Sequence, residues 1–224
     1  MTKFVLIPGA GGAAWYWHRV VPELRAAGHD AVAVDLPGAD GCVGLPEYAD
    51  AVVASIGNDD DVVLVAQSMG GFTAPMVCDR VRVDLLVLVN AMIPLPGETP
   101  GQWWDNTGSA EARVTAAETG GYTPEFDLAT YFLHDVPDEI VAAGAAHERP
   151  EADIAFSQPC DIERWPDVAT RVLVAAGDRF FPLEFQRRVA RDRLGIDIDQ
   201  IPGGHLVALS RPAELVDRLI EYLP

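Results

Sequence analysis

The chain has 224 residues, of which 49% are apolar, so it is long enough to bury a core and is not a disordered polypeptide. Against 16 Lys and Arg residues stand 34 Asp and Glu residues, which gives a formal net charge of −18. This charge opposes binding to nucleic acids and to anionic membrane surfaces. Three scattered cysteines without a CxxC pair exclude a disulfide framework and favour a reducing, cytoplasmic location. The apolar run Phe4–Ile7 is too short for a signal peptide, and no run reaches the roughly 18 residues of a membrane span.

Short apolar runs alternate with helical patterns along most of the chain. The runs predicted as strands are Lys3–Ile7, Ala31–Val34, Val62–Ala66, Leu85–Val89, Arg171–Ala176 and Ile196–Ile201. Helices are predicted at His18–Ala27, at Leu45–Ile56, between the third and fourth strands, at Glu184–Leu194 and at Ala213–Leu223. The strands are nearly continuous apolar runs, which indicates that both faces of the sheet are covered. The pattern predicts an α/β fold with a six-stranded, mostly parallel sheet flanked by helices.

The stretch from residue 94 to residue 167 interrupts this alternation. It is rich in Pro, Gly and acidic residues, contains Trp103, Trp104 and Trp165, and has helical patches at Ser109–Glu118, Asp127–Leu133 and Asp138–Ala146. Its aromatic residues argue against a disordered linker. We interpret it as a small helical cap inserted after the fourth strand, with residues 1–93 and 168–224 forming the core.

Ser68 lies directly after the third predicted strand and before a helix, in the tract Ala66-Gln67-Ser68-Met69-Gly70-Gly71. A nucleophile elbow needs this strand–turn–helix setting, because the turn is strained and bulky residues two positions before and after the serine would collide. Ala66 stands where the usual pattern has Gly, which makes the match less specific. The setting nevertheless predicts that Ser68 is a nucleophile.

A nucleophilic serine needs a base, and the base needs an acid that orients it. Of the five histidines, only His205 follows a strand and can face Ser68 across the carboxyl ends of a parallel sheet. Asp178 follows the fifth strand, whereas the fourth strand ends at Asn90, which is not a carboxylate. A loop histidine and a solvated turn carboxylate are the alternatives. The order Ser68, Asp178, His205, each at a strand end, favours a catalytic triad.

The glycine-rich loop Pro8–Gly12 follows the first strand. It lacks the spacing of a phosphate-binding or dinucleotide-binding loop. The backbone N–H groups of Ala10 and Met69 are candidate donors to an oxyanion, with a plain glycine-rich turn as the alternative.

These motifs resemble those of the α/β-hydrolase superfamily. The tract from Lys3 to Gly12, followed by Trp15-Tyr16-Trp17, is similar to the plant methylesterase and hydroxynitrile-lyase branch. The resemblance implies an α/β-hydrolase fold with Ser68 as nucleophile, His205 as base, Asp178 as acid, Ala10 and Met69 as oxyanion donors, and no cofactor or metal. Pro8 replaces the usual His of the first loop, which raises the question of how that loop is braced. Gly177, directly before the acid, is a further departure from the family pattern.

We therefore expect a cofactor-independent serine hydrolase that cleaves a small-molecule carboxylic ester through an acyl-enzyme. Several aromatic residues are among those that we predict to line the substrate pocket, and packing in the core is the alternative role for them. A hydrolase of carbon–carbon bonds would need a cation for a substrate carboxylate, which Arg113, Arg149 or Arg164 could supply if they are not simply solvated. The residues predicted to line the substrate pocket are Gly11, Trp103, Trp104, Phe132, Phe156, Phe180, Phe181 and Leu206.

Two other classes remain open, a lyase on the same scaffold and a ligand-binding receptor with little turnover. The related lyases carry a Lys directly after the catalytic His, where this chain has Leu206. They also use a hydroxyl side chain in the first loop, and Ala10–Ala14 contains none. Both differences favour an ester as substrate. We expect a small-molecule partner rather than nucleic acid or membrane, and a homodimer is compatible with the sequence.

Overall fold

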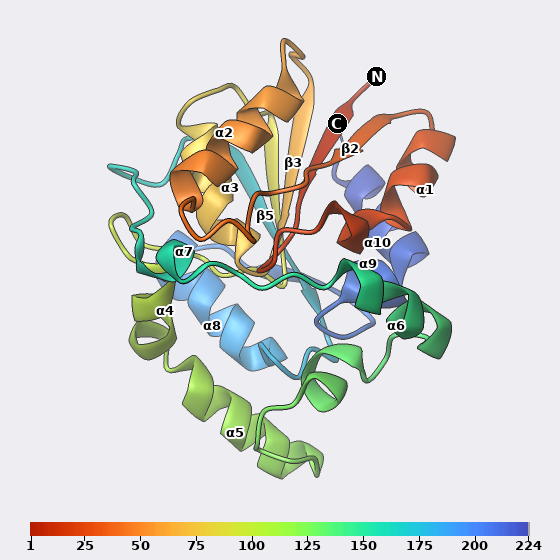
Figure 1. Cartoon of the computed structure of the whole chain (residues 1–224), viewed down its shortest axis with the longest axis vertical. Coiled ribbons are helices and arrows are strands. Elements are labelled where there is room, and N and C mark those ends of the chain that lie inside the picture. Colours follow the sequence, from red (N-terminus) through yellow and green to blue (C-terminus); the bar gives the residue numbers. More distant parts are fainter. Residues whose placement is uncertain (224) are drawn as a thin grey trace.

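The computed structural model describes residues 1–223 and contains a central sheet with helices on both faces (Figure 1). Six strands lie in the order β2-β1-β3-β4-β5-β6, and every neighbouring pair is parallel. The predicted six-stranded α/β sheet is therefore confirmed. The strands are β1 (Lys3–Ile7), β2 (Asp30–Ala33), β3 (Val62–Gln67), β4 (Leu85–Val89), β5 (Ala169–Ala175) and β6 (Ile198–Ile201).

Each face of the sheet packs against its own set of helices. Val5 and Ile7 belong to one apolar cluster, whereas the alternate residues Phe4 and Leu6 of the same strand belong to the other. Because both sets of side chains are buried, the strands are apolar at every position rather than at every second one. The first cluster includes α2 (Leu45–Ile56), α3 (Gly70–Cys78) and α8 (Leu183–Leu194), and the second includes α1 (Val20–Ala26), α9 (Val207–Ser210) and α10 (Pro212–Glu221).

The chain between β4 and β5 forms short helices beyond the carboxyl ends of the strands (Figure 1). All of them fall within residues 94–167, the predicted cap. The division of the chain into a core and a separate cap stays a prediction. These helices are α4 (Pro100–Thr107), α5 (Ser109–Gly120), the π-helical turn η2 (Ala129–Leu133), α6 (Asp138–Gly144), the 3₁₀ turn η3 (Ala145–His147) and α7 (Asp153–Ser157).

The structure differs from the sequence prediction at two segments near the carboxyl ends of the strands. The helix predicted at His18–Ala27 begins only at Val20, because Ala14–Trp17 forms a separate 3₁₀ turn, η1. The four-residue helix α9 follows His205 and is too short to produce a helical pattern in the sequence. Both segments lie close to the candidate site described below. Within residues 1–223, no helix combines the length and the apolar character needed to cross a bilayer.

A buried ion pair joins α8 to the chain that enters α4. Arg193 and Glu98 form a double hydrogen bond, and their side chains are only 7% and 4% exposed. Asn106 Nδ2 donates to the same carboxylate at 2.7 Å. Burial raises the pKa of Glu98, but the bonds from Arg193 and Asn106 outweigh that effect and leave the pKa below its ordinary value. The pair therefore stabilises the fold when Glu98 is ionised.

We expect Arg193→Met to lower the free energy of unfolding by about 3–5 kcal/mol at neutral pH, because it leaves a buried carboxylate unpaired. Urea unfolding measures this loss. A group with a lowered folded-state pKa contributes stability above its unfolded pKa and loses it as pH falls through the folded value. The difference between wild type and variant should therefore shrink in acid, and Glu98→Gln added to Arg193→Met should recover part of the loss. Equal stability of wild type and Arg193→Met at neutral pH would contradict the prediction.

Candidate active site

Ser68 occupies a strained turn between β3 and α3. Its backbone φ of +51° lies in the left-handed region, which residues other than glycine rarely adopt. Two glycines make this turn feasible: a Cβ on Gly70 would lie 2.7 Å from the Pro8 carbonyl oxygen, and one on Gly71 would lie 1.9 Å from that of Met92. Ala66 is fully buried, so its methyl group is accommodated where the family pattern has Gly. The strand–turn–helix arrangement predicted around Ser68 is present in the structure.

His205 lies in the loop between β6 and α9 and is fully buried. Its Nε2 atom is 3.1 Å from Ser68 Oγ, and its Nδ1 atom is 2.9 Å from Asp178 Oδ2. Because an ionised carboxylate only accepts hydrogen bonds, Nδ1 carries the proton and Nε2 is left as the acceptor for the serine hydroxyl. The structure thus brings the three predicted residues together in the geometry of a serine, a base and an orienting acid.

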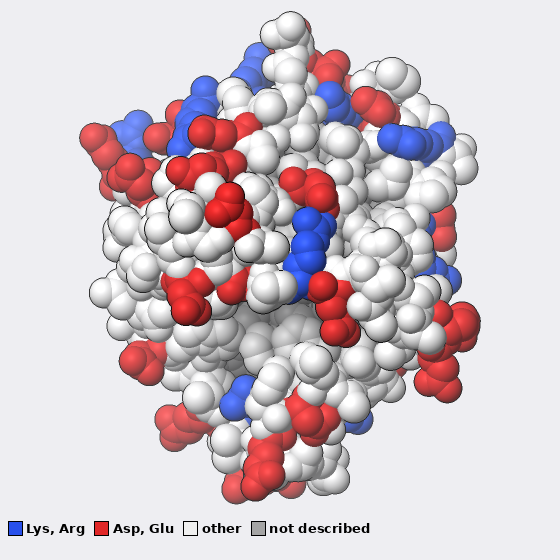
Figure 2. Space-filling model, viewed as in Figure 1, with Lys and Arg blue, Asp and Glu red and all other residues white. Residues whose placement is uncertain are grey.

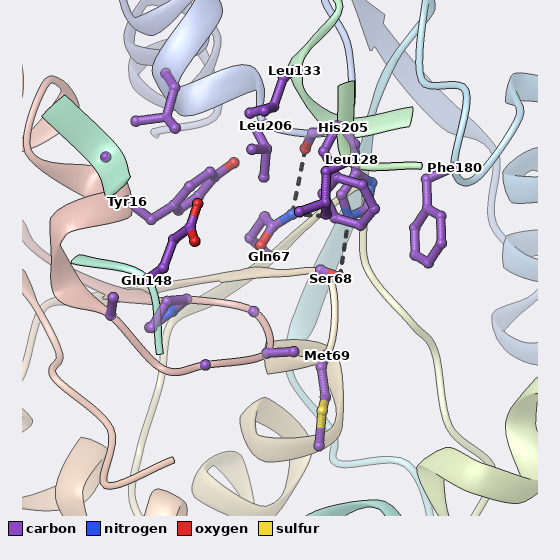
Figure 3. A pocket seen from close by; sticks show the side chains of 18 of the residues that line it. Tyr16, Gln67, Ser68, Met69, Leu128, Leu133, Glu148, Phe180, His205 and Leu206 are labelled. Atoms are coloured by element: carbon purple, nitrogen blue, oxygen red, sulfur yellow. Dashed lines mark hydrogen bonds between the residues drawn. The ribbon is translucent and has the colours of Figure 1, made fainter. Parts of the chain in front are cut away.

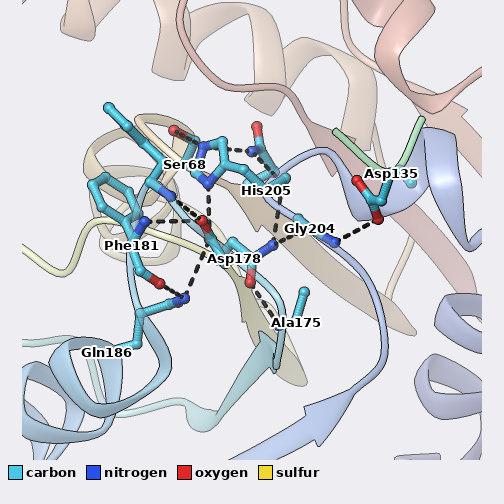
Figure 4. Close-up of polar contacts among 12 residues, drawn as sticks. Ser68, Asp135, Ala175, Asp178, Phe181, Gln186, Gly204 and His205 are labelled. Atoms are coloured by element: carbon cyan, nitrogen blue, oxygen red, sulfur yellow. Dashed lines mark hydrogen bonds and ion pairs between the residues drawn. The ribbon is translucent and has the colours of Figure 1, made fainter. Parts of the chain in front are cut away.

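Asp178 is 4% exposed and is held on both oxygens (Figure 4). Its Oδ1 accepts from the backbone N–H groups of Phe180 and Phe181 at 2.8 and 2.9 Å. Its Oδ2, which faces the imidazole, also accepts from Gln186 Nε2 at 3.3 Å. These donors fix the carboxylate plane and support its negative charge in a buried setting. The carboxylate can therefore orient the His205 ring.

Asn90, at the end of β4, occupies a position where a catalytic acid could have stood. It instead supports the loop that carries His205. Its φ is +45°, and its Nδ2 atom donates to the carbonyl oxygens of Gly204 and His205, each at 3.1 Å. Its Oδ1 accepts from Ala175 N at 2.8 Å. An amide, which both donates and accepts, satisfies these three backbone groups, whereas a carboxylate would face two carbonyl oxygens. The sequence gives no signal for this role, because it depends on contacts more than 80 residues away.

Two further side chains around His205 escaped the sequence analysis. Gln67 is buried, and its Nε2 atom lies 3.3 Å from His205 Nε2 and 3.4 Å from the His205 carbonyl oxygen. Asp135, which follows η2, accepts from Gly204 N at 2.6 Å (Figure 4). The only sequence signal for Gln67 is its position directly before Ser68, and Asp135 has none. Both hold the loop that carries the histidine.

The loop Pro8–Gly12 passes directly over the elbow. A Cβ on Gly9 would lie 2.6 Å from Gln67 Oε1 and 2.9 Å from Ser68 Cβ, so only glycine allows this approach. Among residues 1–223, neither Ala10 N nor Met69 N donates a hydrogen bond to another group of the protein. Two unused amides beside a buried serine can bind a developing oxyanion.

Residues 4–218 match the alpha/beta hydrolase family. The chain belongs to this family. Methylesterase 7 of Arabidopsis thaliana is 29% identical to it, over 98% of this chain and 95% of the relative. Alpha-hydroxynitrile lyase of the same organism is 25% identical, over 96% of this chain and 95% of the relative. The crystal structure of polyneuridine aldehyde esterase shares the fold, with a TM-score of 0.79 at 22% identity, covering 99% of this chain and 98% of that one. The resemblance drawn from the motifs, to the plant methylesterase and hydroxynitrile-lyase branch, is confirmed.

In this alpha/beta hydrolase, Ser68 and His205 open into a cavity of about 500 Å³. Tyr16 and Glu148 lie on one side of the serine and Phe180 on the other (Figure 3). The face of the molecule shown in Figure 2 is hollowed near its centre and mostly uncharged there, with acidic and basic side chains around the hollow. Six of the eight residues predicted for the pocket line the cavity, namely Gly11, Trp104, Phe132, Phe156, Phe180 and Leu206.

The other two predicted pocket residues, Trp103 and Phe181, do not line the cavity. Both are fully buried, and Trp103 Nε1 donates to the Ile93 carbonyl oxygen at 3.1 Å. Phe181 packs between that indole and the His205 ring, at centroid distances of 5.2 and 5.1 Å. Neighbouring residues on a helix point about 100° apart, so Trp104 can face the cavity while Trp103 packs into the core. These two aromatic residues therefore pack in the core behind the cavity wall.

The three arginines considered for a substrate carboxylate have other environments in this alpha/beta hydrolase. Arg113 lies over the rings of Phe126 and Tyr131, at 5.5 and 5.3 Å. Arg164 is exposed and lies away from the cavity wall. Arg149 does line the cavity, but it forms an ion pair with Asp35. Within residues 1–223, no group of three or more His, Cys, Asp or Glu side chains is placed to hold a metal ion.

Proposed function

We propose that this chain is a serine hydrolase that cleaves a small, uncharged carboxylic ester. The observation that carries the proposal is the continuous hydrogen-bonded series Ser68–His205–Asp178 at the wall of the cavity. Relatives named methylesterase and esterase support the same class of carboxylic-ester hydrolase. The series explains how a neutral hydroxyl becomes a nucleophile at neutral pH.

In the proposed mechanism, Ser68 Oγ attacks the ester carbonyl carbon while His205 Nε2 takes its proton. Asp178 stabilises the resulting imidazolium through Nδ1–H. The amides of Ala10 and Met69 hold the negative oxygen of the tetrahedral intermediate. Collapse of this intermediate breaks the bond to the alcohol, which leaves with the proton from His205. A water molecule, deprotonated by His205, then hydrolyses the acyl-enzyme and releases the carboxylic acid.

The cavity disfavours a substrate that carries a carboxylate. Its wall around Ser68 is built largely from aromatic and aliphatic side chains, among them Trp104, Phe132 and Phe180. Arg149, the one arginine that lines the wall among residues 1–223, is paired with Asp35. A substrate carboxylate would lose its hydration here without gaining an unpaired cation, which is costly. This argues against the carbon–carbon bond hydrolase that binds a substrate acid.

A fluorophosphonate probe and a panel of p-nitrophenyl esters test the proposal together. We expect one covalent adduct by mass spectrometry and turnover of p-nitrophenyl esters with short or medium acyl chains. Graded acyl lengths, from acetate to decanoate, report the length that the cavity accepts. A receptor with little turnover would form the adduct but fail to hydrolyse any ester. Failure to form an adduct would exclude an activated serine and overturn the proposal.

A lyase is the second candidate, because alpha-hydroxynitrile lyase is among the relatives. A lyase of this type must stabilise cyanide, an anion, as it leaves. The residue after the catalytic His is Leu206, whose side chain lines the cavity, whereas Lys3 lies in β1 and is bound to Asp59. The site therefore lacks the cation that the related lyases carry.

We expect hydrolysis of esters without release of cyanide from mandelonitrile or acetone cyanohydrin. A colorimetric cyanide assay, corrected for spontaneous decomposition, measures the second reaction, and Ser68→Ala serves as the enzyme control. Leu206→Lys tests the physical reason, because a cation placed beside His205 should raise cyanide release from a cyanohydrin without improving ester turnover. If the wild type cleaves cyanohydrins, Ser68→Ala does not, and no ester is hydrolysed, the lyase assignment replaces the esterase assignment.

A further inference from the structure

The loop Pro8–Gly12, which we call the oxyanion loop, requires a support that the sequence does not reveal. Gly11 and Gly12 both have positive φ, at +83° and +66°, so this backbone has little intrinsic stiffness. Gly12 N donates to Gly9 O at 3.1 Å, and Leu36 N donates to Gly12 O at 2.9 Å. These bonds hold the end of the loop but leave the peptide between Ala10 and Gly11 without a partner inside the loop. Pro8, in place of the usual His, supplies no side-chain hydrogen bond either.

A cap segment, residues 149–152, supplies that partner. The chain between α6 and α7 crosses in front of the carboxyl end of β1 (Figure 1). Glu151 Oε2 accepts from Gly11 N at 2.6 Å, and its other oxygen accepts from the Tyr48 hydroxyl on α2. A Cβ on Gly11 would lie 2.6 Å from the Arg149 carbonyl oxygen, so the cap backbone packs directly on the loop.

The two ends of this segment are also attached to the core. Ala152 N donates to Gly38 O at 2.9 Å. Arg149 pairs with Asp35, whose carboxylate also accepts from Ala14 N at 2.9 Å, just after the oxyanion loop. Glu151 is therefore placed by attachments on both sides. Burial raises the pKa of Glu151, although the bonds from Tyr48 and Gly11 act in the opposite direction. The bonds from Tyr48 and Gly11 therefore hold this partly buried carboxylate in place.

We propose that residues 149–152, which we call the clasp, hold the oxyanion loop in its active shape, with Glu151 as the positioning residue. This proposal rests on the proposed ester hydrolysis. Gly11 N belongs to the peptide that begins at the Ala10 carbonyl, so a bond from Gly11 N to Glu151 limits rotation about the backbone bonds of Ala10. It thereby also limits the direction of the Ala10 N–H group. An oxyanion hole stabilises the transition state only when its donors are already oriented. The cap therefore contributes to catalysis as well as to the cavity wall.

Glu151→Ala and Tyr48→Phe test the clasp by steady-state kinetics on a p-nitrophenyl ester. We expect Glu151→Ala to lower kcat about 10- to 100-fold, below the full loss of an oxyanion donor, with KM changed less than about threefold. Tyr48→Phe should show a smaller loss of the same kind. Glu151→Gln retains an acceptor oxygen for Gly11 N and should recover part of kcat. Glu125→Ala, which removes an exposed cap carboxylate that has no side-chain partner within residues 1–223, is the matched control.

Two measurements separate this role from general loosening of the protein. A trifluoromethyl ketone that forms an oxyanion adduct with Ser68 should bind Glu151→Ala more weakly, by about the factor lost in kcat. Hydrogen exchange followed by mass spectrometry should show faster exchange in the peptide that contains residues 9–12, and no change in peptides from β4 or β5. This second readout needs no turnover, so it tests the clasp even if no ester is hydrolysed and the proposed function fails. Unchanged exchange in residues 9–12, or a kcat within twofold of wild type, would overturn the proposal.

Discussion

Ser68→Ala should remove ester turnover and fluorophosphonate labelling together, with a loss in kcat of about 10⁴- to 10⁶-fold. The physical reason lies in the elbow. The strained turn, with φ of +51°, places Oγ 3.1 Å from His205 Nε2, and no other group in that position can form the acyl-enzyme. The residual rate would come from the oxyanion donors and substrate binding. Initial rates at high enzyme concentration measure it.

Ser157→Ala is the matched control, because Ser157, at the end of α7, is an exposed serine whose hydroxyl donates to the Ile154 carbonyl oxygen. It should retain wild-type turnover and labelling. Peptide mapping of the adduct identifies the labelled residue directly. An adduct on Ser55, Ser109, Ser157 or Ser210 would show that the elbow assignment is wrong.

Asp178→Asn should lower kcat by about 10⁴-fold while leaving the fold intact. Two backbone amides, of Phe180 and Phe181, donate to Oδ1 and would keep an oxygen at that position in the variant. The new NH₂ group must then face His205 Nδ1. A donor there forces the imidazole proton onto Nε2, which can no longer accept the proton of Ser68. The pre-steady-state rate of acylation should fall with kcat, and circular dichroism should be unchanged.

The double variant Asp178→Asn/Asn90→Asp tests the other strand end that can carry the acid. We expect no recovery, because a carboxylate at position 90 would replace an amide that donates to the carbonyl oxygens of Gly204 and His205. Recovered turnover in this double variant would mean that the acid can act from the end of β4. Near-normal turnover of Asp178→Asn alone would require a different carboxylate as the orienting acid.

The sequence was sufficient to predict the sheet and the three residues at its edge. The strands are uninterrupted apolar runs, and parallel strands end at one edge, so polar residues that directly follow them meet there. Ser68 and His205 are 137 positions apart in the chain, yet both positions follow from this rule. The small residues around Ser68 are a local requirement of the elbow and are therefore visible in the sequence. Roles for these residues stay proposals until the variants are measured.

Only the tertiary structure decided which residues support and surround that edge. Trp103 and Trp104 are identical and adjacent, but the packing of α4 on the core buries one and directs the other into the cavity. Glu151 reaches Gly11 across 140 positions of sequence, and no local pattern marks it as a hydrogen-bond partner of the loop Pro8–Gly12. Strand-end positions follow from chain direction alone, whereas the direction of a side chain between β4 and β5 depends on how that segment packs on the rest of the protein. Many weak contacts set that packing together, and no short stretch of sequence contains them.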